Sequence, residues 1–143
     1  MASRDYLIRQ IEEMGIFLAL LLRRILKMKE EKQEAQIETA VKEALIQELN
    51  LDIDQVIVLE NEDFIRVVSE YFTSDDQLEK LADILKILGQ DMEKSFTLTK
   101  ANYLRKSLFL YCYLQESSSN FSFERKIRIE ELQGILRENG LLD

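Results

Sequence analysis

The sequence predicts an all-α protein built from antiparallel helical hairpins, with one long helix at its N-terminus. The chain contains no proline and only four glycines, so few residues can interrupt a helix or form the turns of a β-rich domain. Hydrophobic residues make up 46% of the 143 residues and charged residues 32%, which is typical of a globular protein. Apolar residues also recur at helical spacing along most of the chain. A single helical domain over residues 1–143 is therefore expected.

The first helix is expected from about Arg4 to Met28, with Ser3 as its N-cap. Its apolar residues are spaced alternately four and three positions apart, which is a heptad pattern. The seam formed in this way consists of Leu7, Ile11, Met14, Leu18, Leu21, Ile25 and Met28. Gly15 within this helix costs about 1 kcal/mol relative to alanine, so we expect a neighbouring helix to approach closely there.

Residues 14–22 are apolar on nearly every side of the first helix, which is more than one hairpin partner can cover. Two interpretations of the seam stay open. It packs inside its own domain, against the second helix and a helix over residues 75–94, or it is shared with a protein partner or a second copy of the chain. The candidate interface consists of Met14, Phe17, Leu18, Leu21, Leu22, Ile25 and Arg24.

The next segments continue the helical pattern with one ambiguous stretch. A helix over about residues 32–49 is expected to run antiparallel to the first, so that residues 1–50 form an N-terminal hairpin. Residues 51–73 form an acidic connecting segment. Within it, residues 51–59 are expected to be a short helix or an irregular apolar link. A helix capped by Asn61 follows and reaches about residue 71.

Residues 74–143 are expected to hold three further helices. The first starts at a capping box made by Ser74 and Gln77 and runs to about Lys94.

The second of these helices starts at Thr97 or Thr99 and reaches about Glu116. The last helix spans about residues 122–138, and Gly140 provides its C-terminal stop.

Residues 78–110 resemble a tetratricopeptide-like (TPR-like) helix pair. The matching pieces are Leu81-Ala82, Leu88-Gly89, Ala101 and Lys106-Ser107-Leu108, in which small residues let two antiparallel helices pack closely. The whole chain, beginning Arg4-Asp5-Tyr6-Leu7-Ile8-Arg9-Gln10-Ile11-Glu12, is also similar to a bacterial family of small TPR-like proteins of unknown function. The resemblance implies a right-handed TPR-like array over residues 74–143, and it provides no catalytic residue to transfer.

The residue types present exclude most catalytic and metal chemistries. The chain has no histidine, which removes histidine-dependent triads, the Glu-x-x-His motif of di-iron bundles and most zinc sites. Cys112 is the only cysteine, so no intrachain disulfide or oxidising compartment is implied, and we expect a buried structural thiol. Carboxylates such as Glu12, Glu13 and the Asp75-Asp76 pair are explained by helix ends and solvation. We therefore predict no catalytic residue, metal or cofactor.

The charge distribution argues against nucleic acid as a partner. The net charge is −8, and residues 51–95 carry 4 basic and 12 acidic groups, whereas a nucleic-acid binder needs a basic footprint. The apolar run over residues 14–22 is too short to span a membrane, and no signal-peptide pattern precedes it. A cytoplasmic protein without membrane insertion is expected.

A basic cluster follows the apolar run and consists of Arg23, Arg24, Lys27, Lys29 and Lys32. Three interpretations are open: complementarity to the helix dipole, docking onto an acidic partner such as residues 51–95 of another copy, or contact with an anionic membrane surface.

Together these patterns favour a non-enzymatic helical protein that binds a protein partner or forms a homodimer through apolar burial. The alternative is an enzyme or small-ligand protein that uses carboxylates and tyrosines in a helical pocket.

Overall fold

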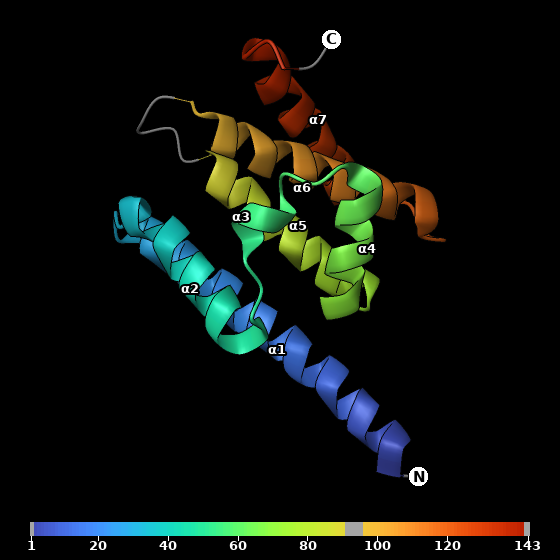
Figure 1. Ribbon diagram of the computed structural model, residues 1–143. Coiled ribbons are helices and arrows are strands. Elements are labelled where there is room, and N and C mark those ends of the chain that lie inside the picture. Colours follow the sequence, from blue (N-terminus) through green and yellow to red (C-terminus); the bar gives the residue numbers. More distant parts are fainter. Residues whose placement is uncertain (1, 91–95, 142–143) are drawn as a thin grey trace.

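The computed structural model describes residues 2–90 and 96–141, with side chains from residue 4 onward. Every regular element in these two stretches is a helix, which confirms the all-α prediction (Figure 1). The elements are α1 (Ala2–Glu30), the short 3-10 helix η1 (Glu34–Gln36), α2 (Ile37–Leu49), α3 (Ile53–Val56), α4 (Asn61–Tyr71), α5 (Asp75–Gln90), α6 (Leu98–Ser117) and α7 (Phe123–Glu138).

The two N-terminal helices form an antiparallel hairpin in which α2 lies along the C-terminal half of α1 (Figure 1). The turn between them is a Schellman motif. Lys32 lies in the left-handed region at φ 60°, and the Gln33 amide donates to the Met28 carbonyl at 2.8 Å. This turn ends α1 after Glu30, and the 3-10 helix η1 follows it. The helix α2 therefore begins at Ile37 and not near residue 32, as the sequence predicted.

Residues 51–59, for which the sequence allowed a short helix or an irregular link, contain the short helix α3. The Asp52 carboxylate caps it by accepting from the Asp54 amide at 3.1 Å. The next helix, α4, begins at Asn61, but its N-cap position is Glu60, so the prediction that Asn61 caps it is wrong. The Asn61 side chain instead accepts a hydrogen bond from the Lys106 ammonium at 2.8 Å.

The start of α5 shows one half of the predicted capping box. The Gln77 amide donates to the Ser74 hydroxyl at 3.2 Å, but the Gln77 side-chain oxygen accepts from the Thr73 amide rather than from Ser74. The predicted end of this helix near Lys94 lies outside the described residues.

Local caps also define the last two helices. The Thr97 hydroxyl accepts from the Lys100 amide and the Ser122 hydroxyl from the Arg125 amide, at 3.2 and 3.1 Å. Gly140 lies in the left-handed region at φ 70° and ends α7. The predicted stop at this glycine is confirmed.

The helices α5 and α6 pack closely and antiparallel. The Ser107 hydroxyl donates to the Ala82 carbonyl at 2.7 Å, and Gly89 lies against Lys100 and Leu104 near the other end of the pair. A Cβ atom on Gly89 would lie 2.5 Å from the Leu104 side chain, so only glycine fits at this separation. The close approach predicted from the small residues is confirmed for this pair.

One hydrophobic core connects all seven α-helices. Its buried members include Leu18 and Ile25 of α1, Val41 and Leu45 of α2, Ile53 of α3, Phe64 and Val68 of α4, Leu85 of α5, Leu104 of α6 and Leu132 of α7.

The N-terminal half of α1 extends beyond the other helices (Figure 1). A Cβ atom added to Gly15 would have no described neighbour within 4 Å, so the close approach expected at this glycine is wrong.

Candidate functional site

The heptad seam of α1 divides into two parts with different surroundings. Leu18, Leu21 and Ile25 are buried in the core of the chain itself. Leu7 and Ile11, which lie earlier in the same seam, are 57% and 44% exposed. All side chains from residue 4 to residue 13 are exposed. The apolar surface left uncovered therefore lies on the N-terminal part of α1.

The remaining candidate interface residues lie at the boundary between these parts. Met14, Phe17 and Leu22 are half-buried against the core, and Arg24 is exposed. Of the seven candidate residues, these four therefore retain surface that a partner could reach. The other three, Leu18, Leu21 and Ile25, pack inside the domain. For this part of the seam, the structure therefore agrees with the first of the two interpretations, packing within the chain itself.

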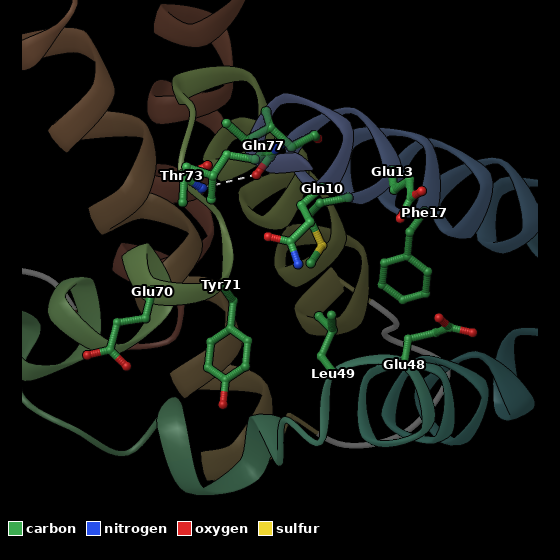
Figure 2. A pocket seen from close by; sticks show the side chains of 12 residues that line it. Gln10, Glu13, Phe17, Glu48, Leu49, Glu70, Tyr71, Thr73 and Gln77 are labelled. Carbon is green, nitrogen blue, oxygen red and sulfur yellow. Dashed lines mark hydrogen bonds between the residues drawn. The ribbon is translucent and has the colours of Figure 1, made fainter. Parts of the chain in front are cut away.

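A groove of about 660 Å³ lies beside the exposed part of the seam, between α1, the C-terminal ends of α2 and α4, and the start of α5 (Figure 2). Its apolar lining consists of Leu7, Ile11, Met14, Phe17, Leu49 and Tyr71. Its polar lining consists of Gln10, Glu13, Glu48, Glu70, Thr73 and Gln77. Figure 2 shows the Phe17 ring facing Glu48 and Leu49 across the groove. Two of the predicted residues, Met14 and Phe17, thus lie in it.

The groove is negatively charged. Glu13, Glu48 and Glu70 are exposed, form no ion pair with any described residue, and have no lysine or arginine beside them in the lining. Glu48 and Glu70 each occupy the last turn of their helix, where the helix dipole already places partial negative charge. The sequence interpretation missed this cluster, although acidic residues without basic ones in the last turns of two helices were a usable local signal.

Gln77 fixes the position of α1 beside the groove. Its side chain is buried, and its Nε2 donates to the backbone carbonyl of Ile11 at 2.9 Å. Its Oε1 accepts from the Thr73 amide at 3.0 Å, the bond drawn in Figure 2. One buried amide therefore joins the start of α5 to α1 at the point where the helix leaves the body of the protein.

A smaller hollow of about 280 Å³ adjoins the groove on the side toward the C-terminal end of α1. It is lined by Phe17, Leu20, Leu21, Arg24, Ala44, Gln47 and Glu48. Phe17 and Glu48 line both spaces. The predicted residue Arg24 therefore stands next to the groove rather than inside it.

Two buried tyrosines relevant to the alternative function, Tyr103 and Tyr111, lie away from the groove in polar contacts within the fold, whereas Tyr71 lines the groove. The Tyr111 hydroxyl donates to the Asp83 carboxylate, and the Tyr103 hydroxyl donates to Asp54 at 3.2 Å. Burial raises the pKa of both tyrosines, followed by the negative charges of Glu38 and Asp54 near Tyr103 and of Asp83 near Tyr111. Burial also raises the pKa of Asp83, against the hydrogen bond from Tyr111 and the nearby Arg128. These groups line neither the groove nor the adjoining hollow.

Two lysines have pKa values shifted in opposite directions, although burial acts the same way on both. Burial lowers the pKa of Lys106, whose ammonium lies 5.4 Å from the centre of the Phe64 ring. Burial acts in the same direction on Lys42, but hydrogen bonds from its ammonium to Glu38 and Asp54 outweigh it and raise the pKa. Neither lysine lines the groove, so both are explained by the packing of the helices.

The remaining chemical groups form no second site. Cys112 is half-buried, and its burial, with the nearby Glu116, raises the pKa of the thiol. Among the described side chains, no cluster of three or more acidic or cysteine ligands could hold a metal ion. None of the described helices combines the length and apolar character that a bilayer-spanning segment requires.

Comparison of the chain with protein-family models, with curated proteins and with solved structures finds no match.

Proposed function

We propose that the protein is a non-enzymatic helical module that binds another protein, or a second copy of itself, through the N-terminal part of α1 and the adjoining groove. The observation that carries this proposal is the exposed apolar surface at this end of the molecule. Tyr6, Leu7, Ile8 and Ile11 are all exposed on a helix that extends beyond its neighbours. Exposed apolar patches of this kind mark interaction sites.

The groove supports the proposal because it continues this apolar surface into the body of the protein. Leu7 and Ile11 belong both to the extended helix and to the groove lining, and Met14 and Phe17 follow on the same helix face. A partner placed here would bury apolar side chains in the middle of the contact and meet glutamates at its rim. That arrangement of an apolar centre within a polar rim is typical of protein interfaces.

An enzyme or small-ligand protein based on carboxylates and tyrosines receives less support. Its expected feature is an enclosed pocket that holds buried carboxylates without partners. The glutamates of the groove are exposed, and every buried side-chain nitrogen or oxygen among the described residues has a hydrogen-bond partner.

We also propose that the protein belongs to the bacterial family of small TPR-like proteins that its sequence resembles, and that it is cytoplasmic. The close α5–α6 pair at Gly89 supports a TPR-like arrangement of α5, α6 and α7. The unpaired Cys112 is consistent with the expected cytoplasmic location, because a thiol persists in a reducing compartment.

Ile11→Asp tests the proposed surface, and Ile127→Asp is the matched control. Ile127 is a similarly exposed isoleucine on α7 that does not line the groove. Circular dichroism should show both variants folded, because neither side chain is buried. Sedimentation velocity then measures self-association, and peptide selection on immobilised protein measures binding of other chains. We expect a dimer, or a set of selected peptides, that is lost only in Ile11→Asp.

Two results would overturn the proposed function. One is a wild type that stays monomeric and selects no peptide. The other is an association, with itself or with peptides, that Ile11→Asp and Ile127→Asp weaken to the same extent.

A further inference from the structure

We infer that the groove beside α1 receives an amphipathic helix of a partner protein that places apolar side chains on the groove floor and lysine or arginine at its rim. This inference rests on the proposed function and specifies the chemistry of the partner. It follows from the charge, the length and the side-chain chemistry of the groove.

The charge of the groove selects a cationic partner. Glu13, Glu48 and Glu70 come from three different helices and converge on one space without a basic residue in its lining. Glu48 and Glu70 lie in the last turns of α2 and α4, where the helix dipoles add to the negative potential. A lysine or arginine at the rim would meet both the carboxylates and these helix ends, whereas a carboxylate would be repelled.

The length of the groove favours a helix over a small cation. Its lining includes Leu7, Ile11, Met14 and Phe17, which follow one another at helical spacing along a single face of α1. These residues extend over about 15 Å of helix, or roughly three turns. A partner helix of three to four turns would match this apolar face with anchors of its own spaced three and four residues apart. A small cation would leave most of this face uncovered.

The opposite wall limits the shape of the partner. Leu49 and Tyr71 face the groove from the ends of α2 and α4, so the space is bounded by apolar side chains on both sides (Figure 2). Glu48 and Glu70 are the immediate sequence neighbours of these two residues. Each apolar contact of the wall therefore has a carboxylate beside it, which is the pattern an amphipathic helix with basic flanks would complement.

Two synthetic helical peptides of equal length test the inference. One carries leucine on its apolar face and lysine on its polar face, and the other carries glutamate in place of lysine. Each is labelled with a fluorophore, and binding to the full chain is followed by fluorescence anisotropy. We expect the leucine–lysine peptide to bind the wild type and Ile127→Asp but not Ile11→Asp. The leucine–glutamate peptide should bind the wild type much more weakly.

A charge-reversal pair separates the groove from the general acidity of the protein. The test variant is Glu48→Lys with Glu70→Lys, and the control is Glu130→Lys with Glu138→Lys on α7, where both glutamates are exposed and outside the groove. Both double variants change the net charge equally. We expect roughly tenfold weaker binding of the leucine–lysine peptide to the test variant, little change in the control, and improved binding of the leucine–glutamate peptide to the test variant.

The outcomes distinguish this inference from the proposed function. Equal binding of the two peptides, or equal weakening by the two double variants, overturns the cationic partner but leaves a protein-binding surface. A wild-type dimer that Glu48→Lys with Glu70→Lys dissociates overturns it as well, because the occupant would then be a second copy. If neither peptide binds, the wild type is monomeric and no peptide is selected, the proposed function itself fails.

Discussion

Gly89 offers the sharpest test of how α5 and α6 pack, and Gly15 offers the matched control. Both glycines lie inside helices, so replacement by alanine improves helix propensity at each by about 1 kcal/mol. Their surroundings differ. A Cβ atom at position 89 would lie 2.5 Å from both Cγ and Cδ2 of Leu104 and 3.0 Å from the carbonyl oxygen of Lys100. A Cβ atom at position 15 would have no described neighbour within 4 Å.

The expected magnitudes follow from these contacts. Leu104 is fully buried, so its side chain cannot move away from a methyl group on residue 89 without disturbing the core. The added methyl therefore costs about 1–3 kcal/mol of overpacking, which the gain in helix propensity offsets in part. We expect Gly89→Ala to lower the free energy of unfolding by up to about 2 kcal/mol. Gly15→Ala should raise it by about 1 kcal/mol, because only the propensity changes.

Urea unfolding followed by far-ultraviolet circular dichroism measures both changes as shifts of the transition midpoint at constant slope. The opposite signs of the two variants are the informative result, since a general preference for alanine over glycine would move both midpoints upward. A Gly89→Ala protein as stable as Gly15→Ala would show that α5 and α6 do not approach closely at this residue. A Gly15→Ala protein less stable than the wild type would show that α1 is covered at that point.

Two further predictions concern titratable groups. Burial raises the pKa of Asp83 above its ordinary 3.8, so its contribution to stability is greatest below pH 3.8 and is lost as pH rises through the raised value. As the pH rises from 3.8 through the raised value, the free energy of unfolding of Asp83→Asn should therefore increase relative to that of the wild type, as measured by urea titration at each pH. A difference between the two proteins that does not change with pH would contradict this prediction. Because burial raises the pKa of Cys112, iodoacetamide should alkylate it roughly tenfold more slowly in the folded than in the urea-unfolded chain, and equal rates would refute this.

Several helix boundaries were predictable because their signals are local. Ser74, Thr97 and Ser122 each bond an amide three residues further on, and Gly140 adopts the left-handed conformation that ends a helix. These interactions depend on a few adjacent residues and can be inferred from residue type and spacing. The boundary of α2 was wrong because Lys32, not a glycine, adopts the left-handed turn.

The surroundings of α1 could not be predicted in the same way. The heptad pattern is identical before and after Met14, yet Ile11 is exposed and Leu18 is buried. The difference arises because the rest of the chain covers only part of a long helix, and periodicity contains no information about where that coverage ends. The groove likewise depends on Glu48 and Glu70, which are distant in sequence and come together only through the packing of α2 and α4 around α1.

The hydrogen bond from Gln77 to the Ile11 carbonyl separates two kinds of helix within α1. After this point the helix is held by the core, and before it the turns depend on their own backbone hydrogen bonds, which hold short helices only marginally in water. Part of the free energy of any binding at Leu7 and Ile11 is therefore spent on keeping these first turns helical. Gly15→Ala would strengthen that binding without adding a contact, because it raises the helix propensity beside these turns by about 1 kcal/mol.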